Sequence, residues 1–143
     1  MSAELIGDLK IAYNKLKKGD IQRHIEPLYS ADIVFVDPAN RIEGRQRMLE
    51  HFESLYENLS SCTFEYHDQD CITSSDSALL VWTMQFNHKR LAGGKTIQVE
   101  GSTLLRFHNQ IFYHRDWFDL GEMLYENLPI VGGLVKSIKR KLQ

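Results

Sequence analysis

Helical periodicity occupies the first part of the chain, and strand-like patterning occupies most of the rest. Apolar residues recur at helical spacing over residues 5–16, before Gly19, and again over residues 21–29, which predicts two helices. A third helix is expected after Gly44, because apolar residues from Met48 to Leu59 form one stripe with charged residues between them. The chain therefore begins with three amphipathic helices.

Polar residues mark where two of the early elements begin and end. Asp20 is expected to cap the second helix, because an aspartate at this position accepts an unpaired backbone N–H. The β-branched run from Ile33 to Val36 predicts a short strand. Asp37-Pro38 stops this strand, because proline disfavours its continuation and restrains the residue before it. Asp37 is therefore expected at a strand end.

The second half of the chain has the pattern of long strands. We expect strands over residues 62–73, 78–90, 96–107 and 110–119, with turns at 74–76, 92–94 and 108–110. The tail is broken at Pro129 and Gly132-Gly133, which predicts helices over 121–128 and 133–142. Three helices followed by a meander predict an α+β fold in one domain, residues 1–143. Its curved, mostly antiparallel sheet would wrap around the helices and enclose a cone.

The composition excludes several classes of protein. Hydrophobic residues at 43%, charged residues at 25% and a formal net charge of -2 are ordinary globular values, and they give no field suited to nucleic acid. Residues 1–20 lack the apolar core of a signal peptide, and no apolar stretch approaches the roughly 20 residues of a membrane span. We therefore expect a cytoplasmic protein that binds no nucleic acid.

The two cysteines and six histidines predict neither a disulfide nor a metal site. On a single extended strand the sulfurs of Cys62 and Cys71 would lie roughly 30 Å apart, so we expect reduced thiols. The histidines lack paired metal-ligand spacing such as HxxxH, and a zinc site needs three or four ligands. We expect no metal and no cofactor, and we expect His114 to hydrogen-bond Asp116 or a ligand.

Two motifs carry a resemblance to a known family. The segment from Gly19-Asp20 to Asp37-Pro38 resembles ketosteroid isomerase, and the run from His114 to Asp119 resembles the last strand of limonene epoxide hydrolase. With the order of elements, nearly the whole chain resembles the SnoaL-like branch of the nuclear transport factor 2-like superfamily. The resemblance implies a cone-shaped α+β fold with Asp37 as a proton-transferring base and Asp116 as a catalytic acid/base.

Four positions depart from the patterns of these enzymes. Thr103 stands where the isomerase has a protonated aspartate. Ala12 stands where the isomerase has a tyrosine, and Tyr13 is turned by about 100° from that position on a helix. Gln85-Phe86-Asn87 replaces the Arg-x-Asp of the epoxide hydrolase, which removes an arginine and a second carboxylate. The sequence therefore matches neither reaction in full.

Strand parity and the family alignment together predict the lining of the cone. Successive side chains of a strand alternate between its faces. If Asp116 points inward, Phe112, His114 and Phe118 on the same strand also point inward. The family alignment adds residues of the two preceding strands: Thr83, Gln85, Asn87, Val99, Gly101, Thr103 and Leu105. The resulting predicted site has Asp116 and Asp37 as catalytic residues, and as ligand-binding residues Phe35, Thr83, Gln85, Asn87, Thr103, Phe112, His114 and Phe118.

The same parity predicts a large aromatic surface on the opposite face of the sheet. Its members are Trp82, Met84, Phe86, Tyr113 and Trp117. A monomer rarely leaves so much aromatic surface in water, so we expect a homodimer that pairs through this face.

Several alternatives stay open from the sequence alone. Asp37 could cap a turn through nearby backbone, and Asp116 could form a structural ion pair beside Arg115. The basic tail helix is expected to pack over the domain or the cone mouth rather than to contact a membrane. We interpret the protein as binding a small, largely apolar molecule with acid/base chemistry of isomerase or hydrolase type. The alternative is a non-catalytic ligand-binding or protein-interaction module.

Overall fold

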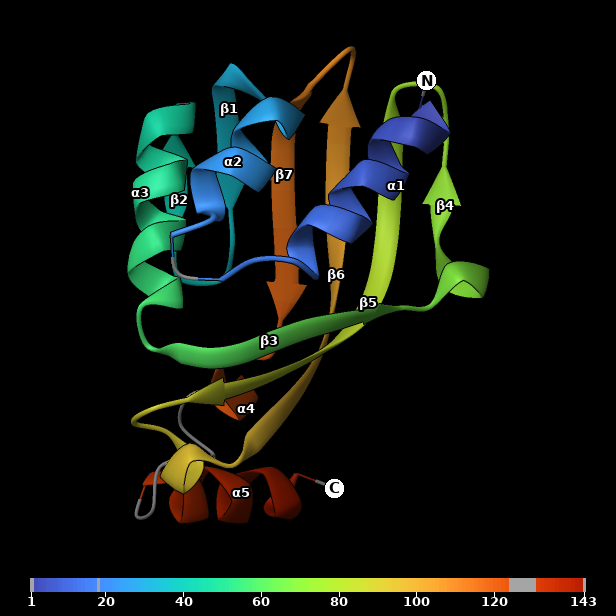
Figure 1. The fold of residues 1–143 in the computed structure, drawn as a ribbon. Helices are drawn as coiled ribbons and strands as arrows, with labels where there is room; N and C mark the ends of the chain where they lie inside the picture. Colours follow the sequence, from blue (N-terminus) through green and yellow to red (C-terminus); the bar gives the residue numbers. More distant parts are fainter. Residues whose placement is uncertain (1, 18, 124–130, 143) are drawn as a thin grey trace.

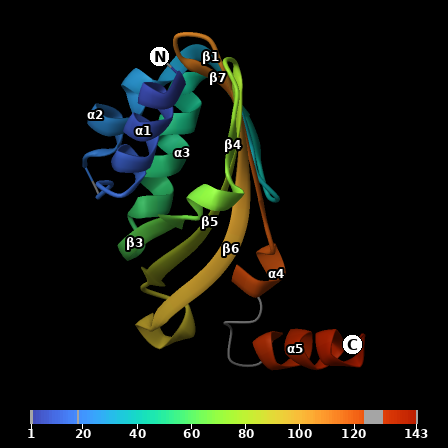
Figure 2. The same ribbon diagram turned by 90° about the vertical axis from the view of Figure 1, so that its right-hand side faces the viewer.

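The computed structural model describes residues 2–17, 19–123 and 131–142. Three helical segments precede most of the sheet, as the periodicity predicts: α1 (Ser2–Tyr13), α2 (Ile21–Ile25), which continues as the 3-10 turn η1 (Glu26–Leu28), and α3 (Arg45–Tyr56). Figure 2 shows α1, α2 and α3 together on one side of the sheet, whose strands β5 and β6 curve towards them at their lower ends.

The seven strands form one mixed sheet (Figure 1). They are β1 (Tyr29–Val36), β2 (Arg41–Glu43), β3 (Leu59–Tyr66), β4 (Ile72–Thr73), β5 (Ser77–His88), β6 (Thr96–Phe107) and β7 (Ile111–Phe118). Their order is β2-β1-β7-β6-β5-β3, with β4 beside β5. The β1–β7 pair is parallel and the other pairs are antiparallel. The predicted α+β fold with three N-terminal helices on a mostly antiparallel sheet is confirmed.

The core lies between the helices and the concave face of the sheet. Apolar residues of the helices, such as Leu9, Ile21 and Met48, are fully or almost fully buried. On the sheet they meet equally buried residues such as Leu80 and Leu105. Removing this apolar area from water is the main stabilising term of the fold. It also fixes which side chains of β5, β6 and β7 face the helices.

The first two helices differ from their predicted ends. Helix α1 stops at Tyr13 rather than before Gly19. The next residue, Asn14, hydrogen-bonds the backbone of Phe64 in β3 twice, accepting from its N–H at 2.7 Å and donating to its carbonyl at 3.1 Å. Asp20 occupies the N-cap position of α2 as predicted, but its side chain makes no cap hydrogen bond and lies 3.5 Å from the guanidinium of Arg23 instead.

The predicted strand over residues 62–73 is two strands. β3 ends at Tyr66, and the 3-10 turn η2 (Asp68–Asp70) separates it from β4. The separation of roughly 30 Å between the cysteine sulfurs assumed one extended segment and therefore does not apply. Cys62 and Cys71 are nevertheless free thiols. The early strand begins at Tyr29 rather than Ile33, and the short strand β2 was not predicted at all.

The tail contains α4 (Leu120–Met123) and α5 (Val131–Lys141). The rest of the predicted helix 121–128 lies outside the described residues, whereas α5 corresponds to the predicted basic helix. The expectation that α5 packs over the domain or the cone mouth is wrong, because Leu134, Ile138 and Leu142 are 63%, 51% and 83% exposed. Among the described helices, none is long and apolar enough to cross a membrane.

Candidate functional site

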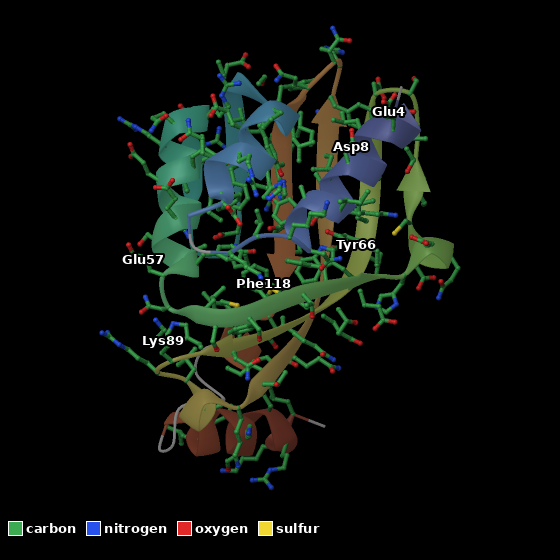
Figure 3. All side chains as sticks on the ribbon, in the orientation of Figure 1. Glu4, Asp8, Glu57, Tyr66, Lys89 and Phe118 are labelled. Atoms are coloured by element: carbon green, nitrogen blue, oxygen red, sulfur yellow. The ribbon has the colours of Figure 1, made fainter. Side chains whose placement is uncertain are left out.

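A cavity of about 320 Å³ lies between α1, α3 and the concave face of the sheet. Eight aromatic side chains line it: Tyr13, Phe35, Phe52, Tyr56, Phe64, Trp82, Phe86 and Phe118. Phe118 lies at the end of β7 (Figure 3). Ala39 and Leu55 are the exposed members of the lining and mark its rim, between the β1–β2 turn and α3. The polar members are Asp37, Asn40, His51, His88 and Asp116.

Asp116 is held in the cavity wall by two neighbours. Its Oδ1 accepts a hydrogen bond from Thr103 Oγ1, which lies directly across the β6–β7 pair. The same oxygen lies 2.8 Å from His114 Nε2, two residues away on the same face of β7. The Asp116 side chain is 19% exposed and that of His114 4%. Among the described residues, the hydrogen bonds to this carboxylate all end on Oδ1.

A buried chain of hydrogen bonds extends from Asp116 in both directions. On one side His114 Nδ1 lies 2.9 Å from the hydroxyl of Tyr29, which lies 2.7 Å from the hydroxyl of Tyr13. On the other side Trp82 Nε1 donates to Thr103 Oγ1 at 2.8 Å. Burial raises the pKa of both tyrosines well above the usual value, so both hydroxyls keep their protons at neutral pH.

One set of donor directions satisfies this whole chain. In this set Tyr13 donates to Tyr29, Tyr29 donates to His114 Nδ1, and His114 Nε2–H donates to the Asp116 carboxylate. Thr103 donates to the same oxygen and accepts from Trp82. In this set His114 Nδ1 accepts from Tyr29 and Nε2 carries the hydrogen that bonds Asp116. The chain fixes the position of Asp116 and leaves Oδ2 as its oxygen for a ligand.

Asp37 lines the same cavity as Asp116. Its Oδ1 accepts the backbone N–H groups of Ala39 at 2.8 Å and Asn40 at 2.7 Å, which is the turn-capping role left open above. The two aspartates thus share a cavity but differ in setting. Asp37 stabilises the β1–β2 turn at the rim, and Asp116 belongs to the buried hydrogen-bond chain.

The predicted facing of β5 is wrong. Trp82, Met84 and Phe86 line the cavity, and the alternate residues lie on the other face. There Thr83 hydrogen-bonds His67, Gln85 hydrogen-bonds Gln98, and Asn87 hydrogen-bonds the Gly94 carbonyl and Thr96. The reason is strand pairing: Leu80 lies opposite Thr103 and Trp82 opposite Gly101, and directly opposed residues share a face. An inward Thr103 therefore requires an inward Trp82.

The other predicted ligand-binding residues have mixed positions. Phe35 and Phe118 line the cavity, and Val99, Thr103 and Leu105 lie on the buried face of β6 as expected. Phe112 does not line the cavity. A β-bulge between Ile111 and Tyr113 shifts the alternation, so that Ile111 is buried while Phe112 contacts His108 in the β6–β7 turn.

The sequence reasoning missed Tyr13, Tyr29, His51 and Trp82 as site residues. Tyr13 lines the cavity although it was expected to be turned away from the isomerase position. His51 lines it from α3, and its buried Nε2 has no hydrogen-bond partner in the described structure. A histidine in the apolar stripe of a helix beside Phe52 was the available signal for His51. In the described ranges, no group of three or more potential ligands could hold a metal ion.

The predicted dimer surface loses most of its members. Because Trp82, Met84 and Phe86 face the cavity, only Tyr113 and Trp117 of the predicted patch lie on the outer face. Trp117 is 41% exposed and is covered in part by the guanidinium of Arg115, 4.7 Å from its ring centre. The large aromatic surface that was the main reason to expect a homodimer is therefore reduced to Tyr113 and Trp117, and the homodimer stays a prediction.

Cys62 is expected to be an unreactive thiol in the cavity wall. Burial raises its pKa from 9.0 to about 11, although a hydrogen bond with Tyr56 lowers it in part. In a Cys71→Ser protein near pH 8, native Cys62 should react with iodoacetamide about 100-fold more slowly than in the unfolded chain, because two pKa units reduce the thiolate fraction a hundredfold. The rate should rise with pH towards 11. Equal rates in native and urea-unfolded protein, followed by mass spectrometry, would contradict this.

Comparison with known proteins places this geometry in context. Residues 12–114 match the SnoaL-like domain family. A hypothetical protein with a ketosteroid isomerase-like fold from Catenulispora acidiphila, in complex with trimethylamine, superimposes with a TM-score of 0.72 at 17% identity, covering 89% of this chain and 94% of that one. A LEH-like epoxide hydrolase from M. tuberculosis gives 0.70 at 18% identity, covering 95% and 98%. An NTF2-like protein of unknown function from Burkholderia pseudomallei gives 0.70 at 12%, covering 84% and 94%. These likenesses establish the fold alone, and no curated protein matches the sequence.

Proposed function

The chain belongs to the SnoaL-like domain family, and from that premise we propose that its cavity binds a small, largely apolar molecule with which Asp116 exchanges a proton. The observation that carries the proposal is the fixed carboxylate. Two hydrogen bonds end on Asp116 Oδ1 at the wall of an apolar cavity, which leaves Oδ2 as the acceptor for a proton of the ligand. A positioned carboxylate with few competing water molecules suits general acid/base catalysis.

The lining defines the class of ligand. A volume of about 320 Å³ is at the lower end of the range for small-molecule sites and accommodates one small ring system. The aromatic walls favour an apolar body, and the few polar groups call for a ligand with one or two polar atoms. His51 supports this view, because its buried Nε2 lacks a partner among the described residues. A buried nitrogen without a partner is costly, and a ligand atom could supply the missing hydrogen bond.

Two structural neighbours are consistent with this proposal. The Catenulispora acidiphila protein was crystallised with trimethylamine, and the M. tuberculosis protein is a LEH-like epoxide hydrolase. Asp37 would act as a second carboxylate at the rim rather than as the main base, because its Oδ1 already accepts two backbone N–H groups. Because these backbone bonds occupy Asp37 Oδ1, they also favour the second candidate function, in which the cavity binds the same class of ligand but catalyses no reaction. The two candidates share ligand binding and differ only in proton transfer through Asp116.

Ligand binding can be tested with the tryptophan of the cavity wall. The chain has two tryptophans, of which Trp82 lines the cavity and Trp117 lies outside. In a Trp117→Phe protein, 4-nitrophenol should quench the Trp82 emission along a saturable curve, because the ligand would sit against the indole ring. The matched Trp82→Phe protein, which retains only Trp117, should show weak quenching that does not saturate. Linear quenching in both proteins would contradict binding in the cavity.

A further inference from the structure

The helix α5 has an exposed apolar stripe bordered by positive charge. Leu134 and Ile138 lie four residues apart on one side of the helix, and Leu142 follows at the same interval in the turn just after Lys141; each is more than half exposed. At about 100° per residue, Lys139 and Lys141 border this stripe, and Lys136 and Arg140 lie on the opposite side. Such a helix is suited to the boundary between an apolar layer and water.

The position of α5 leaves the stripe available to a large surface. Figure 2 shows α5 below the sheet, with its C-terminal end extending away from α1, α2 and α3. Residues 131–143 hold four basic and no acidic side chains. Because the whole chain carries a formal net charge of -2, residues 1–130 carry -6. The positive charge is therefore concentrated on the element whose apolar residues are exposed.

An ion pair links α5 to the cavity. Lys139 Nζ lies 3.0 Å from Asp119 Oδ2, and Asp119 Oδ1 accepts the backbone N–H of Glu122 at the start of α4. These two bonds, with that of Glu122 the larger contribution, hold the pKa of Asp119 below its usual value. Leu120 and Met123 of the same short helix line the cavity. The charged tail thus lies beside the part of the wall that α4 provides.

We propose that α5 docks the protein on an anionic lipid bilayer, with Leu134, Ile138 and Leu142 inserted among the acyl chains and Lys136, Arg140 and Lys141 paired with the lipid headgroups. Charge complementarity selects this occupant over a second copy of the chain. Two copies of α5 joined through their stripes would gather eight cations with no acidic residue of either helix to pair with them. An anionic bilayer satisfies both the apolar stripe and the charge. The proposal does not depend on proton transfer in the cavity.

The test is sedimentation of the full chain with lipid vesicles. The wild-type protein should bind vesicles of equal parts phosphatidylcholine and phosphatidylglycerol at least about tenfold more tightly than vesicles of phosphatidylcholine alone, and high salt should weaken this binding. A Leu134→Ser/Ile138→Ser protein and a Lys136→Gln/Arg140→Gln/Lys141→Gln protein should each lose at least about tenfold in binding. All these positions are on the surface, and circular dichroism checks that the variants fold.

Two control variants remove the same kinds of group from other parts of the surface, an exposed apolar side chain in one and exposed positive charge in the other. Ile72→Ser removes an apolar side chain that is 68% exposed on β4, and Lys15→Gln/Lys17→Gln removes exposed charge beyond α1. Both control proteins should bind the anionic vesicles like the wild type. The proposal is overturned if the wild type ignores anionic vesicles, if it binds neutral ones equally well, or if the tail variants bind undiminished. It is also overturned if the tail variants instead convert a dimer to a monomer by light scattering, since the stripe would then pair two copies.

Discussion

Replacing Asp116 by asparagine is expected to lower the rate of a base-catalysed probe reaction by at least about 100-fold. A suitable probe is 5-nitro-1,2-benzisoxazole, a small apolar bicycle. In its elimination a base takes the proton from C3, the C–H electron pair forms the nitrile, and the N–O bond breaks to give 2-cyano-4-nitrophenolate. The proton would pass to Asp116, whose Oδ1 is held by Thr103 and His114. The product is followed by its absorbance, without any knowledge of the natural ligand.

The asparagine keeps the shape of the site while removing the base. Its amide oxygen can still accept from Thr103 and His114, so the variant should fold like the wild type. The matched change Asp37→Asn should lower the rate less than about threefold, because its amide oxygen can still accept the N–H groups of Ala39 and Asn40. A wild-type rate no greater than that of Asp116→Asn would remove Asp116 as the base and favour binding without chemistry. A large loss in Asp37→Asn alone would assign the role to Asp37.

Gly101→Ala is expected to destabilise the fold by about 3 kcal/mol, at the upper end of the usual cost of overpacking. A Cβ on Gly101 would lie within 2.6 Å of the backbone oxygen of Trp117 and would overlap the indole ring of Trp82. The backbone oxygen is fixed in the β6–β7 pair and cannot move aside cheaply. Thermal unfolding should show a decrease in Tm of roughly 10 °C for a chain of this length.

Gly7→Ala provides the control for the same chemical change. Gly7 lies within α1, and a Cβ there meets no atom within 4 Å. Alanine is the better helix former, so this variant should be more stable by about 0.5–1 kcal/mol. Opposite signs at the two glycines would support the close packing of Trp82 against β6. A Gly101→Ala protein as stable as the wild type would show that the Trp82 ring and β7 can shift, and with them Thr103 and Asp116.

The order of the elements was predictable because it depends on local patterns. The stripe from Met48 gives α3, which ends at Tyr56 so that Leu59, the last member of the predicted stripe, begins β3. The alternating segments after Ser77 give β5, β6 and β7. Asp37 and Asp116 were placed by motifs, and both line the cavity. The end of α1 depends instead on Asn14 bonding to β3, a contact between residues 50 positions apart. No local pattern around Asn14 contains that information.

The sequence does predict which β5 side chains face the cavity, but the correct signal is the amphipathic alternation and not the family alignment. Leu80, Trp82, Met84 and Phe86 alternate with Val81, Thr83, Gln85 and Asn87, and plain amphipathic alternation puts the apolar set inside. The family alignment gave the opposite result, and its one-residue offset reversed every side chain. The predicted inward position of Phe112 was wrong for a non-local reason, because the bulge beside it arises from the pairing of β6 with β7. The chain from Asp116 through His114 and Tyr29 to Tyr13 likewise joins three elements that only the fold brings together.

A crystal structure of the protein with 4-nitrophenol is the most direct test of the proposed site. The proposal predicts the aromatic ring in the cavity near Phe35 and Phe118, with the phenol oxygen about 3 Å from Asp116 Oδ2. The second distance to measure is that between His51 Nε2 and the nitro group, because His51 Nε2 lacks a hydrogen-bond partner in the described chain. An empty cavity at saturating ligand, or a ligand bound only on the outer face of the sheet, would contradict a small-molecule site at Asp116.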